Sequence, residues 1–111
     1  MSTISVPRHN DLDRPEVWQA RVDLAACFRA AAQMGLHEGI CNHLSFMVPG
    51  RDDLFLVNPD GWSFGEITAS RLLICDFARN VVAGSGTPED TAFFIHARVH
   101  ANVPRARAAF H

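Results

Sequence analysis

Residues 43–57 have the sequence HLSFMVPGRDDLFLV, in which two short apolar segments flank a turn. Residues 43–48 partly alternate between apolar and polar side chains, and residues 54–57 form an unbroken apolar run. Between them, residues 49–53 are rich in turn-forming side chains. The stretch therefore predicts a β-hairpin, in which the two strands pair antiparallel.

A long amphipathic helix is predicted before the hairpin. Apolar side chains recur at spacings of three and four residues from Val17 to Met34, which is typical of one face of a helix. Asp13 is placed to cap this helix, Pro15 suits its first turn, and Gly35 is suited to end it. We therefore expect a helix from about residue 15 to residue 35.

The chain after the hairpin alternates between turns and short regular elements. Asp90 or Thr91 is placed to cap a second helix that extends to about Asn102 and is closed by Pro104. The other predicted elements are a turn at 58–61, one helical turn at 68–71, a second hairpin with strands at 72–76 and 81–83, and the start of a buried strand at 108–111.

Length and composition indicate one folded domain. The chain has 111 residues, of which 48% are hydrophobic and 20% charged. Residues 1–12 are polar and turn-rich and are expected to form a flexible lead-in to a domain over residues 13–111. No apolar run approaches the roughly 20 residues that span a bilayer, and no signal-peptide pattern is present, so we expect a cytoplasmic protein without a membrane partner.

Several kinds of chemistry are excluded by residue types that the chain lacks. Lysine is absent, which excludes Schiff-base catalysis and a P-loop lysine, and tyrosine is absent, which excludes a phenolic acid. The net charge is −2 and the arginines are scattered, so no nucleic-acid partner is expected. Cys27, Cys41 and Cys75 are odd in number and widely spaced, which predicts buried or half-buried free thiols rather than disulfides.

The histidines are the main candidates for metal binding. His96 and His100 lie four residues apart on the second predicted helix, so they share a face that suits a metal. A zinc-protease motif needs Glu after the first His, where this chain has Ala97. The alternative is that one of these histidines is packed or hydrogen-bonded while the other lies at the helix edge. His111 lies on a predicted strand, where a second histidine at position 113 would point the same way.

The loop between the first helix and the hairpin is a candidate binding segment. Residues 35–45, GLHEGICNHLS, are rich in Gly and small polar side chains, whose backbone N–H groups and amides suit an anion or a carbonyl oxygen. A plain helix-to-strand connection that uses Gly for a positive φ explains the same composition.

The order and spacing of five segments are informative. The segments are GLHEGICNHLS (35–45), LVNPDGWSFGEITAS (56–70), LLICD (72–76), NVVAGSG (80–86) and FFIHARVHANVPRARAAFH (93–111). Together with the preceding helix, they resemble the N-terminal part of the class II aldolase/adducin family over roughly residues 17–111. The resemblance implies an α/β fold, a three-layer α/β/α sandwich with a mostly antiparallel central sheet that is incomplete at the C-terminus.

For the enzymes of this family, the resemblance implies a divalent metal such as Zn²⁺, held by an H-x-H pair and a later histidine. His111 matches the first histidine of that pair, so the metal is expected in a longer chain that carries the others. Asn42 and His43 match the substrate loop, and Asp60 and Gly61 are placed on its rim. The resemblance also implies a small-molecule substrate and a homo-oligomer, which in this family is a tetramer.

The chain departs from the aldolase pattern in ways that favour the adducin-like branch. Ala92 occupies the position of the aldolases' acid/base carboxylate, four residues before His96, and Glu89 and Asp90 are the nearest substitutes. The stretches ICNHLS (40–45) and NPDG (58–61) stand where sugar-phosphate aldolases have sequences such as TSGNIS and TPSG. His100 replaces a frequent tyrosine and is interpreted as a packing position.

Two functions follow from the resemblance. The first is a metal-dependent aldolase-like lyase, or a related epimerase or decarboxylase, for a small hydroxy-carbonyl or sugar-derived substrate. The alternative is a noncatalytic adducin-like module for self-association or protein binding, which Ala92 favours. A third possibility is that the 111-residue chain is unstable alone, because its last strand leaves a sheet edge and apolar surface uncovered.

Overall fold

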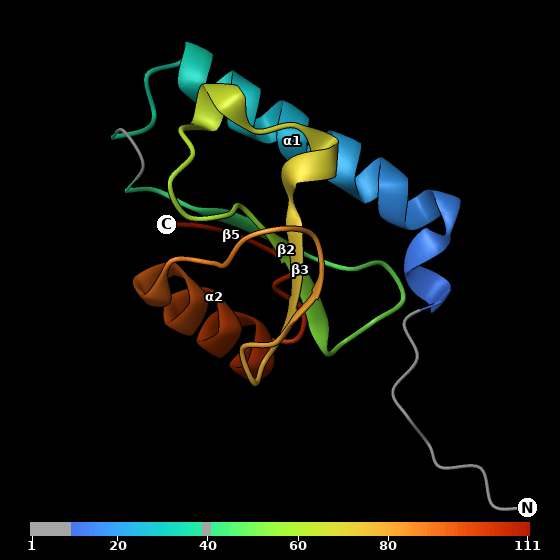
Figure 1. Cartoon of the computed structure of the whole chain (residues 1–111). Helices are drawn as coiled ribbons and strands as arrows, with labels where there is room; N and C mark the ends of the chain where they lie inside the picture. Colours follow the sequence, from blue (N-terminus) through green and yellow to red (C-terminus); the bar gives the residue numbers. More distant parts are fainter. Residues whose placement is uncertain (1–9, 39–40) are drawn as a thin grey trace, which may run out of the picture.

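The computed structural model describes residues 10–38 and 41–111, which form three layers. A five-stranded sheet lies in the middle, with the helix α1 on one side and α2 on the other (Figure 1). The predicted α/β/α sandwich with an antiparallel sheet is thereby confirmed. The part of the predicted lead-in at residues 1–9 lies outside the described residues, and a short 3₁₀ helix, η1 (Asn10–Asp13), precedes α1.

The first helix, α1, covers Pro15–Gln33 and confirms the helix predicted over residues 15–35. Its cap residue is Arg14, without a side-chain cap, so the prediction that Asp13 caps the helix is wrong: Asp13 lies in η1. The chain turns away at Gly35, whose φ of +71° suits glycine. The buried residues of α1 are Val17, Ala20, Leu24, Ala25, Phe28 and Ala31.

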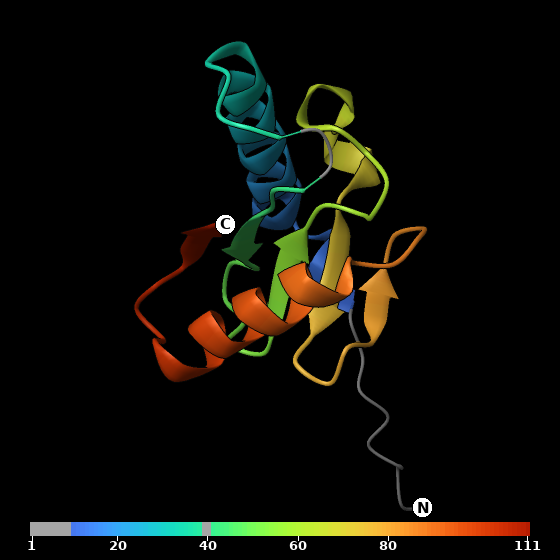
Figure 2. The same ribbon diagram turned by 90° about the vertical axis from the view of Figure 1, so that its left-hand side faces the viewer.

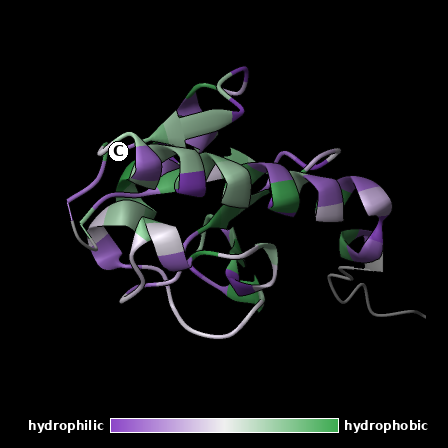
Figure 3. Cartoon of the chain, turned by 90° about the horizontal axis from the view of Figure 1, so that it is seen from above, coloured by the Kyte–Doolittle hydropathy of each residue, from purple (hydrophilic) through white to green (hydrophobic). Residues whose placement is uncertain are grey.

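Hydrophilic and hydrophobic residues alternate along α1, the longest described helix, when the molecule is seen from above (Figure 3). Neither α1 nor any other helix of the described residues has the length and apolar character needed to cross a membrane.

The sheet has the strand order β4-β3-β2-β1-β5, and every neighbouring pair is antiparallel (Figure 2). Both predicted hairpins are confirmed, because β1 pairs with β2 and β3 pairs with β4. The bounds of the strands are β1 Leu44–Met47, β2 Leu54–Val57, β3 Leu73–Asp76, β4 Val81–Ala83 and β5 Ala108–Phe110.

The central strand β2 contributes to the hydrophobic core on both faces of the sheet. Leu54 and Leu56 pack in the cluster under α1, whereas Phe55 and Val57 pack in the cluster under α2. All four side chains are fully buried, because successive residues of a strand point to opposite faces and both faces are covered. This double burial explains why residues 54–57 are an unbroken apolar run rather than an alternating one.

The second helix, α2, covers Asp90–Asn102, as predicted. Its cap is Glu89, whose carboxylate accepts a hydrogen bond from the Ala92 N–H at 2.9 Å. The prediction that Asp90 or Thr91 caps the helix is therefore wrong by one or two residues. Between β2 and β3 lie two short 3₁₀ helices, η2 (Phe64–Glu66), which was not predicted, and η3 (Ala69–Arg71), which corresponds to the predicted helical turn.

Two burial predictions are corrected by the structure. The strand at residues 108–111 forms as β5, but its residues are exposed or half-buried, because β5 lies at the edge of the described sheet, next to β1. Phe110 is 54% exposed. All three cysteines are free, but Cys27 and Cys41 are exposed, and Cys75 is the buried one.

Replacement of Gly84 by alanine is expected to lower the free energy of unfolding by about 1–3 kcal/mol. Gly84 has a φ of +101°, and a methyl group on it would lie 2.9 Å from Leu73 Cδ2 and 3.1 Å from the Leu72 carbonyl oxygen. Urea unfolding monitored by circular dichroism measures the change. Gly65→Ala is the control, because Gly65 has open space around it. If Gly65→Ala lowered the free energy of unfolding as much as Gly84→Ala, the explanation from the φ and contacts of Gly84 would be wrong.

Candidate functional site

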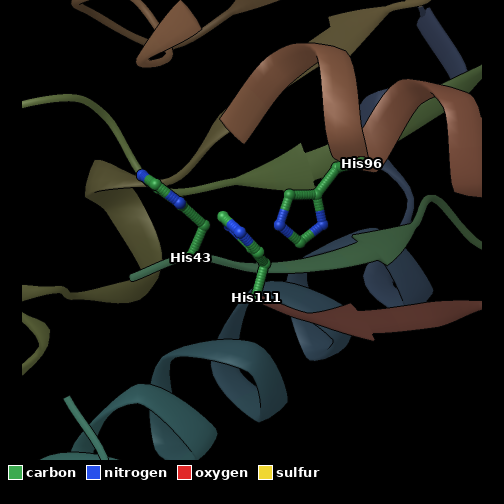
Figure 4. A group of neighbouring side chains, drawn as sticks. All are labelled: His43, His96 and His111. Carbon is green, nitrogen blue, oxygen red and sulfur yellow. The ribbon is translucent and has the colours of Figure 1, made fainter. Parts of the chain in front are cut away.

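Three histidines from distant parts of the sequence converge on one point of the sheet (Figure 4). His43 directly precedes β1, His96 lies in the middle of α2, and His111 directly follows β5. One ring nitrogen from each lies within 4.8 Å of the other two. We refer to these residues as the histidine cluster.

The β1–β5 register brings His43 and His111 together. Leu44 pairs with Phe110, so the next position along each strand sets His43 opposite His111. The two residues exchange backbone hydrogen bonds, from His43 N to His111 O at 2.6 Å and from His111 N to His43 O at 2.8 Å. Directly opposed residues of antiparallel strands present their side chains on the same face. The two rings accordingly stack, with centroids 5.8 Å apart and planes 8° from parallel.

The histidine cluster borders a pocket of about 330 Å³. The pocket is lined by Cys41, His43, Asp60, Glu89, Thr91 and His111. The third histidine, His96, is fully buried behind it, with ring centroids 6.2 Å from His43 and 6.3 Å from His111. The site therefore has a buried back wall and an exposed front, since His111 is exposed.

Burial keeps the inner histidines neutral. Desolvation by burial is the main cause that lowers the pKa of His96 to about 3, and the neighbouring histidines contribute to the same shift. Burial also lowers the pKa of His43, against the opposing effect of the Glu89 carboxylate. A neutral imidazole has a free ring-nitrogen lone pair, which is the form that binds metals. Both ring nitrogens of His43 and Nε2 of His96 are buried and have no hydrogen-bond partner in residues 10–38 and 41–111.

Two acidic residues line the same pocket. Glu89 Oε2 lies 3.7 Å from His43 Nε2. The N–H groups at the start of α2, chiefly that of Ala92, hold the pKa of Glu89 below its usual value, so Glu89 is ionised at neutral pH. Asp60 lies in the turn after β2, where its backbone N–H donates to the Thr87 carbonyl at 2.9 Å.

Behind the cluster, Ser45 connects two histidines of α2. Its hydroxyl Oγ lies 2.5 Å from His96 Nδ1 and 2.7 Å from His100 Nε2. The other nitrogen of His100, Nδ1, lies 2.9 Å from the Ala106 carbonyl oxygen. His100 also packs against Phe55, with ring centroids 5.6 Å apart, which fits the packing role predicted for it. Both histidines are buried, so the expectation that one lies at the helix edge is wrong.

The structure brings together only part of the predicted site. His43, Asp60 and His111 line one pocket, whereas Asn42 and Gly61 are not among its lining residues. The side-chain oxygen of Asn42 accepts instead from the Glu38 N–H at 2.6 Å. Gly61 occupies the turn with a φ of +90°, which supports the position of Asp60.

The two candidates for the acid that Ala92 does not provide occupy different surroundings. Glu89 lines the pocket, whereas Asp90 is exposed and forms an ion pair with Arg79 away from it. Ala92 is fully buried. The structure therefore favours Glu89 over Asp90 as the acid nearest the histidine cluster.

The sequence pairs His96 with His100 as possible metal ligands, but in the structure the Ser45 hydroxyl lies between these two histidines. The place of His96 in a cluster with His43 and His111 was not predicted, because the three residues meet only through the pairing of β1 with β5 and the packing of α2. Cys41 and Thr91 were likewise not predicted to line the pocket.

Comparison with known proteins gives a consistent family. Residues 22–111 match the model of the class II aldolase and adducin N-terminal domain. The chain is 44% identical over 97 residues to a putative aldolase class 2 protein of Caulobacter vibrioides, a match that covers 85% of this chain and 37% of the relative. It is 33% identical over 98 residues to an adducin-related protein of Schizosaccharomyces pombe, with 82% and 30% covered.

Among solved structures, an L-fuculose 1-phosphate aldolase from Glaciozyma antarctica superposes with a TM-score of 0.80 at 25% identity. The match covers 96% of this chain and 44% of that structure. The chain thus spans less than half the length of these relatives.

Proposed function

Because the chain belongs to the class II aldolase and adducin family, we propose that it carries metal-binding and substrate-binding residues of a divalent-metal-dependent, aldolase-like lyase. A related epimerase or decarboxylase uses the same elements. The substrate is a small hydroxy-carbonyl or sugar-derived compound. The observation that carries the proposal is the histidine cluster at the edge of a pocket that also contains Glu89 and Asp60.

The residues of the cluster fit a metal of the zinc class. Imidazole nitrogens are common ligands of Zn²⁺. Within the described part of the chain, both ring nitrogens of His43 and Nε2 of His96 have no hydrogen-bond partner that a bound metal would displace. His111 is the residue that the family resemblance assigns to the metal, and it lies at the exposed side of the cluster. When bound there, a metal would supply Lewis-acid polarisation of a carbonyl or hydroxyl oxygen of the substrate.

In this proposal, Glu89 has the role of moving a proton. Its carboxylate is ionised, lies in the pocket and is fixed by the N-terminus of α2. Glu89 therefore acts as a base toward a substrate hydroxyl. It takes over the role of the carboxylate that the aldolases have where this chain has Ala92. His43 and Asp60 bind polar groups of the substrate from the other walls of the pocket. Asn42 and Gly61 hold the two loops in place.

Three further expectations accompany this activity. We expect the protein to form a homo-oligomer, namely the tetramer that the family resemblance implies, and to be cytoplasmic. We expect its metal to be zinc.

The test is an activity assay on the protein produced from its native gene, loaded with zinc. A panel of small hydroxy acids and sugar phosphates is screened for release of aldehyde, ketone or carbon dioxide. We expect cleavage that a chelator abolishes and zinc restores. Glu89→Gln keeps an oxygen that can accept from the Ala92 N–H, and it should lower kcat by about 10²–10⁴-fold.

Asp90→Asn is the matched control, because it removes the adjacent carboxylate outside the pocket. Its kcat should remain within about twofold of the parent. Cleavage that survives the chelator, or equal loss in both variants, would contradict the proposal.

The adducin-like interaction module is the second candidate. It is favoured by Ala92 at the acid position and by the 33% identity to an adducin-related protein. This function predicts self-association, measured by analytical ultracentrifugation, that is unchanged by the chelator, together with no cleavage of any compound in the panel.

A further inference from the structure

A buried chain of hydrogen bonds runs from the backbone to the histidine cluster. It leads from the Ala106 carbonyl to His100, then to the hydroxyl of Ser45, and then to His96. Ser45, His96 and His100 are each at most 3% exposed. The order of these contacts determines where each proton lies.

The Ala106 carbonyl can only accept, so His100 Nδ1 carries the hydrogen that joins them. In neutral His100 the other nitrogen, Nε2, is then an acceptor and receives the hydroxyl hydrogen of Ser45. Burial, aided by the Arg107 guanidinium, lowers the pKa of His100 against the opposing effect of the Ala106 carbonyl, and the lowered pKa disfavours a second proton on the ring. Having donated its one hydrogen, Ser45 Oγ can only accept from His96 Nδ1.

His96 Nε2 is therefore left with a lone pair, and it has no hydrogen-bond partner among the described residues. A buried acceptor left unsatisfied costs about 1–3 kcal/mol. Metal-binding histidines characteristically donate their other ring N–H to a neighbouring group, which fixes the ring and its tautomer. Ser45 provides that acceptor for His96, although a carboxylate or carbonyl is the commoner choice.

The distances also suit a shared ion. Nitrogen ligands of a tetrahedral zinc with bonds of about 2.0–2.1 Å lie roughly 3.4 Å apart. The three nitrogens of the cluster lie within 4.8 Å of one another before any ion is present. His96 is held by Ser45, so the nitrogens of His43 and of the exposed His111 are the ones that would move to close this difference.

We propose that His96, through Nε2, and His43 bind the same divalent metal as His111, and that Ser45 and His100 are positioning residues that hold His96 in the Nδ1–H tautomer. The inference rests on the proposed function for the presence of a metal at His111. The tautomer of His96 and the roles of Ser45 and His100 rest on the buried hydrogen bonds, with His100 in its neutral form.

The test is long-range ¹H–¹⁵N NMR of the ¹⁵N-histidine-labelled protein, first without metal and then with zinc. Without metal, His96 should show a protonated Nδ1 and an unprotonated Nε2. Zinc should shift Nε2 of His96 and one ring nitrogen each of His43 and His111, while Nδ1–H of His96 is retained. His37 lies outside the cluster and serves as the internal control, with no shift expected.

Variants of Ser45 distinguish a role in positioning His96 from a purely structural role. Ser45→Ala should produce mixed tautomers of His96 and weaken zinc binding by about 10–100-fold. Ser45→Thr keeps the hydroxyl and should restore both properties, which a purely structural role of the residue would not require. His37→Gln should leave zinc affinity unchanged.

The outcomes distinguish the inference from the proposed function. A protonated Nε2 on metal-free His96 overturns the positioning roles. Zinc that shifts His111 but not His96 overturns the assignment of His96 as a ligand and leaves the proposed function standing. Absence of zinc binding overturns both.

Discussion

Replacement of Phe55 by alanine is expected to lower the free energy of unfolding by about 3–5 kcal/mol. Phe55 lies in the middle strand of the sheet and is fully buried. Its ring lies 5.9 Å from that of Phe77, 6.0 Å from Phe93 and 5.6 Å from His100, measured between centroids. The substitution thus leaves a cavity between the sheet and α2, next to the residues that support the histidine cluster.

Chemical unfolding in urea measures this loss, with Phe94→Ala as the matched control. Phe94 is the neighbour of Phe93 on α2 but is 57% exposed, so its truncation should cost about 0.5 kcal/mol. Equal losses for the two substitutions would show that Phe55 does not occupy the core position described.

Acidification from pH 7 to pH 5 is expected to destabilise the metal-free protein by about 2 kcal/mol through His96 alone. The pKa of His96 is lowered to about 3 in the folded state, whereas an unfolded histidine has its ordinary value near 6.5. Below that value the unfolded chain binds a proton that the folded chain does not, so stability falls as the pH falls. The lowered pKa values of His43 and His100 act in the same direction.

Urea midpoints measured at several pH values in the presence of a chelator test this slope. The carboxylates of Asp11, Glu66 and Glu89 have lowered pKa values. They affect the pH dependence of the free energy of unfolding only in more acidic solution, where carboxylates of the unfolded chain bind protons. His96→Gln removes the titrating group and should flatten the dependence between pH 7 and 5. A parent protein whose stability is constant over this range would contradict the buried neutral state of His96.

The layers of the fold were predictable because their signals are local. The apolar run at residues 54–57, with a turn sequence before it, sufficed to predict the hairpin of β1 and β2. The periodicity from Val17 onward sufficed to predict α1. The exposure of β5 was not predictable, because the local sequence of an apolar strand does not show whether the strand lies in the middle of a sheet or at its edge.

The site was only partly predictable for a related reason. Family resemblance pointed to His43, Asp60 and His111, which line one pocket. The contribution of His96 depends on the register of β1 with β5 and on the packing of α2, and neither is encoded at short range. Glu89, rather than the predicted Asp90 or Thr91, caps α2, and its carboxylate lies 3.7 Å from His43 in the same pocket.

The most direct test of the account is the zinc content of the purified protein after equilibrium dialysis against buffered Zn²⁺. The histidine cluster predicts about one zinc ion per chain, with binding lost when His43, His96 and His111 are replaced together by alanine. The His37→Gln protein should retain the full stoichiometry. A folded parent protein that binds no zinc, or a triple variant that binds as much as the parent, would contradict the metal centre.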